Sequence, residues 1–358
     1  MKNSNINIMK KIIVMLLLSA FVSLTVSAKE KIEKVLVDKK YEVNKDALLQ
    51  IEHQYGNVEC KNWDEGSISV KVVARVETSN REKAEKIFNA IKINLDGDRS
   101  GVSVESEFSG KLFDKGNNNL SIDFEIFLPA SVRLDLEHQF GNAYIETIEG
   151  EAQVSNEYGN LEINELKSTS NSIEIGFGNA SIGYINAGDI EVDYSSVELG
   201  KSESLSIEAN YSNLSIGKVG DLEIENEGGQ VEIGKVAVLS MSSKFSDFKV
   251  GELKASLVGE TEYGSFSVKN IRADFTHIEL ENSFGSVSLY FEPEGAFEII
   301  AEMEFCTLNY PDEVADFSKR IVSSSADSYY EGRIGEGSTN GSKVDLVSEY
   351  GGVSIYFR

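Results

Sequence analysis

Apolar and polar residues alternate in short runs along most of this chain, and turn-forming residues separate the runs. Ile173 and Ile175 flank Glu174, and Leu214 and Ile216 alternate in the same way further along. Successive side chains of a β-strand point to opposite faces, so this pattern predicts strands that are buried on one face only. The chain is therefore predicted to be all-β and to contain many short strands.

An aromatic motif returns between these runs at nearly constant spacing. The aligned position is occupied by Phe140, Tyr158, Phe177, Tyr194, Tyr211, Gly228, Phe245, Tyr263 and Phe284, at spacings of 18, 19, 17, 17, 17, 17, 18 and 21 residues. Outlying copies begin at Tyr55, Phe305 and Tyr350. A period this short, with two brief apolar alternations in each copy, predicts one coil of a parallel β-solenoid of about 17 residues per coil.

Each copy of the motif is interpreted as a structural corner. The aromatic residue and the next apolar residue are three positions apart, as Tyr211 and Leu214 show, and an odd offset in a straight strand would place them on opposite faces. If both point inward, the chain must turn between them, and Gly or Ser followed by Asn supplies that turn. The corner residues are Tyr55, Gly56, Asn57, Phe140, Gly141, Asn142, Tyr158, Gly159, Asn160, Phe177, Gly178, Asn179, Tyr194, Tyr211, Asn213, Phe245, Tyr263, Phe284 and Tyr350. A second, glycine-rich corner follows each second strand, as in residues 216–220.

Stacked coils place equivalent residues in columns, about 4.8 Å apart. The rings are expected to form one column, and Asn57, Asn142, Asn160, Asn179 and Asn213 a second one. The position two residues before the aromatic breaks the apolar rule in many coils. It holds His53, His138, Asn156, Ile175, Val192, Ala209, Asn226, Ser243, Thr261 and Asn282. The polar residues at this position collect towards both ends, so either the interior of the terminal coils is more hydrated or the coil widens towards the ends.

The period divides the chain into four segments. Residues 1–28 have Lys10 and Lys11, an apolar run at 12–26 and small residues before a cleavage site at Ala28, which predicts a cleaved signal peptide. Residues 29–134 depart from the period and contain a predicted helix at 81–91, so they are expected to form an N-terminal cap. Residues 135–292 are the regular coils, and residues 293–358 are irregular C-terminal coils or a second cap.

The charge of the chain limits the partners it is expected to bind. The net charge is −25, and removal of residues 1–28 takes away three lysines and no acid, which gives −25 − 3 = −28. Nucleic acid and anionic lipid would be repelled, whereas cations and basic surfaces would not. The apolar run at 12–26 has 15 residues, short of the ~20 that span a bilayer, so no transmembrane segment is expected in the mature chain. Cys60 and Cys306 are far apart and are expected to be packing residues.

The order of these features resembles the DUF4097 family of bacterial adhesin-like proteins. The resemblance is carried by the signal peptide, the strand-helix-strand start, Phe127-Leu128-Pro129-Ala130 leading into Leu134-Asp135-Leu136, and the repeated aromatic-Gly-Asn motifs. It covers most of the mature chain. The resemblance implies a right-handed β-solenoid in an exported bacterial protein, and it offers no catalytic residues.

Three groups of residues could in principle carry chemistry as well as a structural role. His53 and His138 occur in near-identical segments, but both occupy the inner position of the repeat, so packing is favoured over a metal site. The outward acids Glu174, Glu191, Glu208, Glu223 and Glu232 could bind calcium, yet the Gly-Gly-x-Gly-x-Asp repeat of calcium-binding β-rolls is missing. Paired acids could also serve a polysaccharide lyase or hydrolase, in a groove near the insertions after Phe284.

No catalytic, cofactor or metal residue is therefore predicted. The leading hypothesis is a non-catalytic exported protein of the periplasm or cell surface, whose acidic face contacts a protein or glycan of the envelope. A polysaccharide-active enzyme and a calcium-stabilised adhesion module are the two alternatives. The partner, the oligomeric state and the role of the two histidines are left open.

Overall fold

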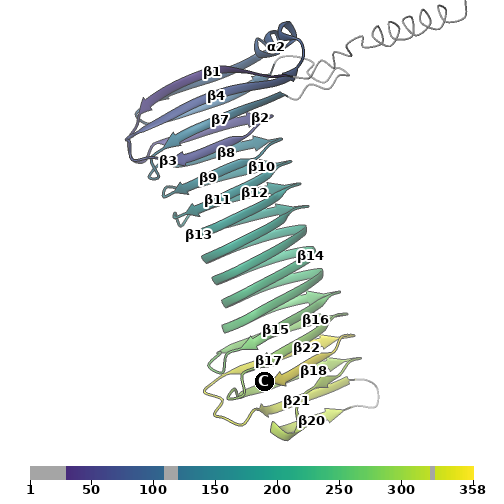
Figure 1. Cartoon of the computed structure of the whole chain (residues 1–358). Coiled ribbons are helices and arrows are strands. Elements are labelled where there is room, and N and C mark those ends of the chain that lie inside the picture. The colour runs from purple at the N-terminus through teal and green to yellow at the C-terminus, as the bar shows by residue number, and fades with distance from the viewer. Residues whose placement is uncertain (1–29, 109–119, 323–326) are drawn as a thin grey trace, which may run out of the picture.

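The chain forms an elongated stack of β-strands with its regular coils in the middle (Figure 1). The structure is a computed structural model that describes residues 30–108, 120–322 and 327–358. The predicted signal peptide lies outside these residues. Strands dominate the described chain, so the prediction of an all-β class is confirmed. The α-helix of the described part is α2 (Arg81–Phe88), and a short 3-10 helix occupies Asp312–Val314.

The strands of the coils form two faces that meet at the aromatic corners. One face contains β2 (Leu48–Gln54), β8 (Arg133–Gln139), β10 (Ala152–Glu157), β12 (Asn171–Gly176), β16 (His277–Ser283), β18 (Phe297–Glu304) and β22 (Lys343–Glu349). The other contains β3 (Val58–Asn62), β9 (Ala143–Ile148), β11 (Asn160–Leu166), β15 (Ser265–Ile271), β17 (Ser286–Phe291), β19 (Leu308–Asn309) and β23 (Val353–Phe357). The long elements β13 (Asn179–Asp193) and β14 (Ser196–Glu262) run through several corners without interruption.

Equivalent strands of neighbouring coils pair in parallel and keep the repeat in register. Val154 pairs with Leu136 on one side and with Ile173 on the other, and Ile190 pairs with Ile207 one coil further. Residues that are equivalent in the sequence repeat are therefore neighbours along the stack. Every inward position then packs above its equivalent in the preceding coil.

The sheet as a whole is mixed, so the prediction of a parallel arrangement is not confirmed for the described chain as a whole. At the N-terminal end β1 (Glu30–Glu42), β4 (Ser67–Thr78) and β7 (Leu120–Leu128) pair antiparallel, as do β5 (Ile91–Asp98) and β6 (Gly101–Phe108). At the C-terminal end β20 (Ala315–Val322) and β21 (Asp327–Ile334) pair antiparallel with each other, and β21 with β18. Antiparallel hairpins need only short connections, so they can end a parallel stack without another full coil.

The order of coils in space differs from their order in the chain at the C-terminal end. Strand β22 pairs in parallel with both β16 and β18, and β23 pairs with both β17 and β19. The last coil of the chain therefore lies between the coil that contains Phe284 and the coil that contains Phe305. The sequence repeat carries no signal for this insertion.

Helix α2 covers one flank of the N-terminal hairpins (Figure 1). The Asn80 side chain accepts a hydrogen bond from the backbone N–H of Lys83 at 3.1 Å, which caps the first turn. The buried residues of the helix, Ala84, Ile87 and Phe88, pack with Ala74 and Val76 of β4. The helix ends at Phe88 rather than at the predicted residue 91, because Ile91 already begins β5.

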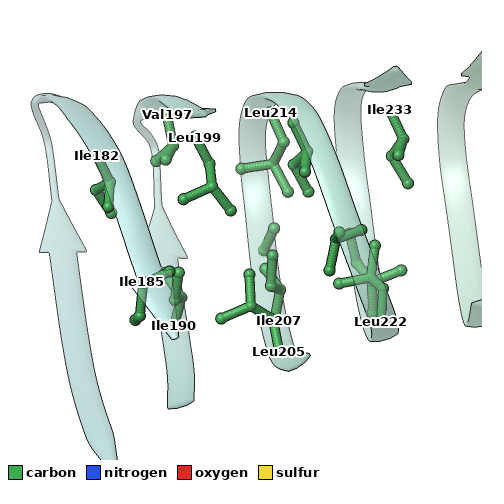
Figure 2. Packing of buried hydrophobic residues seen from close by; sticks show 14 of the residues in the cluster. Ile182, Ile185, Ile190, Val197, Leu199, Leu205, Ile207, Leu214, Leu222 and Ile233 are labelled. Carbon is green, nitrogen blue, oxygen red and sulfur yellow. The ribbon is translucent and has the colours of Figure 1, made fainter. Parts of the chain in front are cut away.

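A single aliphatic core runs along the interior of the coils (Figure 2). Ile182 and Leu199 are stacked equivalents on one side, and Ile190 and Ile207 on the other; all four are buried. Branched aliphatic side chains dominate both inner faces in these coils. Burial of this apolar surface is the main favourable contribution to the stability of such a stack.

Two of the edge strands in the described sheet, β1 and β20, carry features that oppose pairing with another chain. The pairing of β1 with β4 shifts between Val35 and Val37, and that of β20 with β21 shifts between Phe317 and Lys319. Bulges and lysines on edge strands disturb the row of free backbone groups that a foreign strand would need. The edges formed by β1 and β20 are therefore protected, whereas β5 and β19 are also paired on one side only.

Candidate functional site

The aromatic residues of the repeat form a column of stacked rings on the outside of the molecule. Neighbouring ring centroids lie 4.8 to 5.4 Å apart, with planes within 15° of parallel. The rings in spatial order are Tyr55, Phe140, Tyr158, Phe177, Tyr194 and Tyr211, and then Phe245, Tyr263, Phe284, Tyr350 and Phe305. From Phe140 onward the rings are 43 to 59% exposed, so the expectation that they point inward is wrong.

The reason for this error lies in the backbone of the aromatic residue itself. All eleven ring-bearing corner residues have positive φ, between 49° for Tyr194 and 68° for Tyr55. This left-handed conformation is unfavourable for a residue with a side chain, by roughly 1–2 kcal/mol. It turns the chain at the aromatic residue, so the ring leaves the strand pattern and the next residue, such as the buried Ser212, points inward instead.

The aromatic column is interrupted at one place in its length. Gly228 occupies the aligned position with φ of 74°, so the backbone keeps the corner conformation without a ring. Tyr211 lies on one side of the missing ring and Phe245 on the other, and these two rings are 56% and 59% exposed. We call this position the ring gap. The sequence shows the lost ring, but not that it opens the surface of a stacked column.

A column of amides lies beside the aromatic column. The backbone N–H and side-chain Nδ2 of Asn160 both donate to Asn142 Oδ1, at 3.2 and 2.8 Å, and Asn142 donates in the same way to Asn57. Asn57 in turn donates to Asp123 Oδ1, whose carboxylate is paired with Arg75. The chain of bonds satisfies backbone groups at the corner, a role that explains Asn at this position.

The two histidines lie inside the first coils, next to the aromatic corner. Their rings stack at 5.4 Å, and His53 also stacks on Phe124 at 4.2 Å. His138 Nδ1 lies 2.7 Å from Asn156 Oδ1, and its Nε2 lies 2.9 Å from the carbonyl oxygen of Gly56. Burial, followed by the nearby His138, lowers the pKa of His53 to about 3. Across the described residues, no group of His, Cys, Asp and Glu has an arrangement that could hold a metal ion.

A column of glutamates lies on the outward side of the strands that precede the aromatic corner. Glu174 pairs in register with Glu191, and Glu191 pairs with Glu208. The period of 17 residues continues to Glu225. Burial, together with the charges of Glu174, Asp193 and Glu208, raises the pKa of Glu191. We call Glu174, Glu191, Glu208 and Glu225 the acidic column. Glu223 lies on the same strand as Glu225, whereas Glu232 follows the corner on the other face.

The acidic column has no cationic partner among the residues that the structure describes. Of the ion pairs formed among the described residues, none involves Glu174, Glu191, Glu208 or Glu225. Like charges on directly opposed strand positions destabilise a sheet. The column is therefore a feature that folding alone does not favour.

A hollow lies at the C-terminal end, where the repeat is broken. It has a volume of about 480 Å³ and is lined by Glu302, Glu304, Asp327, Tyr329 and Glu349, among others. Glu304 pairs in register with both Asp327 and Glu349, which brings three carboxylates onto adjacent strands. This is the region in which the sequence places the groove of a possible polysaccharide-active enzyme.

Both cysteines are unpaired. Cys60 is buried in the core, where burial raises the pKa of its thiol to about 12. A thiol of this kind is unreactive at neutral pH. Cys306 is half-buried, and its Sγ donates to the carbonyl oxygen of Ser348 at 3.1 Å.

Comparisons with known proteins give a weak likeness to two solved structures. One is a "putative cell adhesion protein" from Clostridium sporogenes ATCC 15579, 11% identical, with 92% of this chain and 100% of that chain covered at a TM-score of 0.20. The other is a "putative adhesin" from Bacteroides fragilis NCTC 9343, 10% identical, with coverage of 93% and 99% at a TM-score of 0.26. No family model matches the chain, and neither does any curated protein. In the described part of the chain, no helix is long and apolar enough to cross a membrane.

Proposed function

We propose that this chain is an exported, non-catalytic protein of the bacterial envelope that contacts another macromolecule through its acidic column. In this proposal the signal peptide is cleaved, and the mature chain acts in the periplasm or at the cell surface as an adhesin or interaction scaffold. The coils form a right-handed parallel β-solenoid of about 17 residues each. The motif resemblance to the DUF4097 family supports this proposal.

The observation that carries the proposal is the unpaired acidic column. The pKa of Glu191 is raised first by burial and then by the charges of Glu174, Asp193 and Glu208, so this carboxylate is costly to charge where it stands. A basic surface on a partner would relieve this repulsion on contact. Electrostatic complementarity of this kind accelerates encounter and selects partners. The aromatic corners and the amide column then serve to build the scaffold.

The proposal is tested by measuring retention of beads that carry the purified chain. The beads are passed over surfaces coated with basic proteins, neutral glycans or acidic glycans. We expect retention on the basic proteins only, and a decrease with added salt because exposed charges are screened. Equal retention on all three surfaces would contradict the proposal.

A matched pair of triple variants separates the acidic column from net charge. The test variant replaces Glu174, Glu191 and Glu208 with Gln. The control replaces Glu162, Glu198 and Glu232 with Gln. These three residues are exposed on the strands after the aromatic corner. Both variants change the net charge equally. We expect retention of the test variant to be about tenfold lower than that of the natural chain, and retention of the control to be unchanged. The reverse result would show that the partner binds the other face.

The C-terminal hollow supports a second candidate, a polysaccharide-active enzyme. Glu304, Asp327 and Glu349 lie on adjacent strands beside Tyr329, an arrangement in which two carboxyl groups could share acid and base roles. Incubation with neutral and acidic glycans, followed by chromatography of the products, tests it. Cleavage that is lost in Glu304→Gln and Glu349→Gln would favour the enzyme over the scaffold.

Calcium-stabilised adhesion is the third candidate, and it uses the same acidic column. It predicts a melting temperature that rises with added calcium and falls with a chelator, because a bound ion stabilises the folded state. An unchanged melting temperature would eliminate it. A shift that persists in the Gln triple variant would place the ion elsewhere.

A further inference from the structure

The ring gap is the one interior position of the described aromatic column where a ring is missing between two stacks. Within each continuous part of the column, a ring is covered on both faces by its neighbours at 4.8 to 5.4 Å. At the gap, Tyr211 stacks only on Tyr194, and Phe245 stacks only on Tyr263. Neither Tyr211 nor Phe245 therefore has a ring partner on the side of Gly228.

The height of the ring gap fits one planar group. Two steps of the column would separate the Tyr211 and Phe245 centroids by about 10 Å, and stacked rings prefer centroid distances of about 4.5–7 Å. A flat group at the middle of the gap would contact both faces at once. A Cβ on Gly228 would lie 2.9 Å from Tyr211 Cδ1, and Tyr211 has the largest tilt in the column, 15°. Tyr211 thus leans into the space and would return to parallel on binding.

The rim of the ring gap carries an acid that the chain leaves without a cation. The Tyr211 hydroxyl donates to Glu227 Oε1 at 3.1 Å, and Glu227 takes part in no ion pair among the described residues. The equivalent residue one coil further is Lys244, whose ammonium is turned to Glu262 at 3.7 Å. The neighbouring strand positions Glu208 and Glu225 add negative charge. The rim therefore favours a cation.

We propose that the ring gap binds an arginine side chain of a partner protein. The guanidinium is the cation that is also planar, so it can stack between Tyr211 and Phe245 while it donates to Glu227. Gly228, which is buried next to the Tyr211 ring, and the exposed Gly229 lack side chains, so the stem of the arginine can approach the corner once Tyr211 has swung back. A lysine ammonium would gain the charge but not the stacking. The proposal rests on the proposed function, because it supplies a specific anchor within the acidic scaffold.

Gly228→Phe is the variant that closes the ring gap. Eleven corner residues already bear a ring at positive φ, so the corner geometry accepts Phe at this position. The close contact of its Cβ is with the Tyr211 ring, which can swing back to the parallel position that the other rings have. The variant is therefore expected to fold, and circular dichroism and the unchanged signals of distant tyrosines verify this.

The experiment is a titration of the purified chain, labelled with fluorotyrosine, followed by fluorine NMR. The signal of Tyr211 is assigned with Tyr211→Phe. The probes are N-acetyl-arginine amide, N-acetyl-lysine amide and N-acetyl-citrulline amide, which is similar in shape to arginine but neutral. We expect arginine to shift the Tyr211 signal and to bind about tenfold more tightly than either other probe. If the lysine probe bound as tightly as the arginine probe, charge attraction alone would explain binding. If the citrulline probe did, stacking alone would explain it. Either result overturns the proposal.

Two variants and a control complete the test. Gly228→Phe should abolish the shift, and Glu227→Gln should weaken arginine binding by about tenfold. Glu157 precedes Tyr158 as Glu227 precedes Gly228, but there the column is continuous, so Glu157→Gln should have no effect. Binding that survives in Gly228→Phe would overturn the assignment of the site.

The outcome is separable from that of the bead experiment. If beads are retained on basic proteins but arginine does not bind, the acidic scaffold stands and the ring gap is only a defect of the column. If arginine binds in the ring gap but no basic protein retains the beads, the site stands and the envelope scaffold fails.

Discussion

In most of the middle coils the chain turns on a large exposed ring at one corner, whereas at the other corner it turns on a glycine. The glycine corner contains Gly183, Gly200, Gly217, Gly234 and Gly251, one per coil, which follow each other along the stack. A Cβ on Gly217 would lie 2.5 Å from the carbonyl oxygen of Gly200. Glycine is required there by the close approach of two backbones, and none of these five residues has positive φ.

The aromatic corner has the opposite arrangement. Its backbone is left-handed, which glycine tolerates best, yet only Gly228 is a glycine there. Stacking of each ring on two neighbours contributes about 0.5–1.5 kcal/mol per pair, enough to offset the conformational cost. One corner is thus governed by space between backbones, and the other by contacts between side chains of successive coils.

The largest effect is expected at the glycine corner. Gly217→Ala should destabilise the chain by about 4 kcal/mol, because the added methyl group meets the backbone of the preceding coil and neither can move without separating the coils. Urea unfolding measures the change. Gly66→Ala is the control, since no atom lies within 4 Å of a Cβ at Gly66. Equal stability of the two variants would show that neighbouring coils slide freely.

A somewhat smaller effect is expected at the position after the ring. A Cβ on Gly159 would lie 1.6 Å from the carbonyl oxygen of Gly141, closer than at Gly217, but other coils accommodate a Cβ at this position, so Gly159→Ala should cost about 3 kcal/mol. Serine replaces glycine here in other coils: Ser195 Oγ accepts from the N–H of Gly178 and donates to the carbonyl of Asp193. Gly159→Ser should therefore be less harmful than Gly159→Ala in the same urea experiment. The reverse order would mean that the hydroxyl bonds do not stabilise the corner.

The buried His53, next to the aromatic corner, should make the stability of the chain depend on pH. Burial lowers the pKa of His53 to about 3, whereas an unfolded histidine has a pKa of about 6.5. Below pH 6.5 the unfolded chain binds a proton that the folded chain does not, so stability falls as pH decreases towards 3. At pH 5 the loss attributable to His53 should be about 2 kcal/mol relative to pH 7.

His53→Asn tests this origin, because Asn156, Asn226 and Asn282 occupy the same inner position in other coils. The variant should lose less stability than the natural chain between pH 7 and pH 5. His277→Asn is the control, since His277 lies on the outward side, 3.3 Å from Glu279. Identical pH profiles of the natural chain and His53→Asn would assign the acid sensitivity to other groups.

Inward positions were predictable from the sequence, whereas the aromatic conformation was not. Alternation alone identifies residues such as Ile190 and Ile207 as core, because burial on one face leaves a local trace in the pattern. Nothing local predicts that Tyr158 adopts positive φ. That conformation is disfavoured for each ring on its own and becomes favourable only when the rings of adjacent coils stack.

The same reasoning applies to the C-terminal coils. The position of β22 between β16 and β18 depends on where the chain returns after residues 293–342, and a repeat motif marks a coil without marking its neighbours. For the candidate site, the acids were visible in the sequence. Which acids belong to the acidic column and which lie on the other face could be assigned only from the pairing register of the strands.

The smallest effect, and the most specific to the aromatic corner, concerns the ring itself. Tyr158→Ala should cost about 1–2 kcal/mol through the loss of two stacking contacts while it retains the left-handed backbone. Tyr158→Gly should be less destabilising by about 1 kcal/mol, because glycine adopts positive φ without strain. At Phe127, an exposed ring in the extended strand β7 that stacks on Trp63, Gly should instead be worse than Ala. If Gly were worse than Ala at both positions, the left-handed corner would cost nothing, and stacking would not be what maintains the ring there.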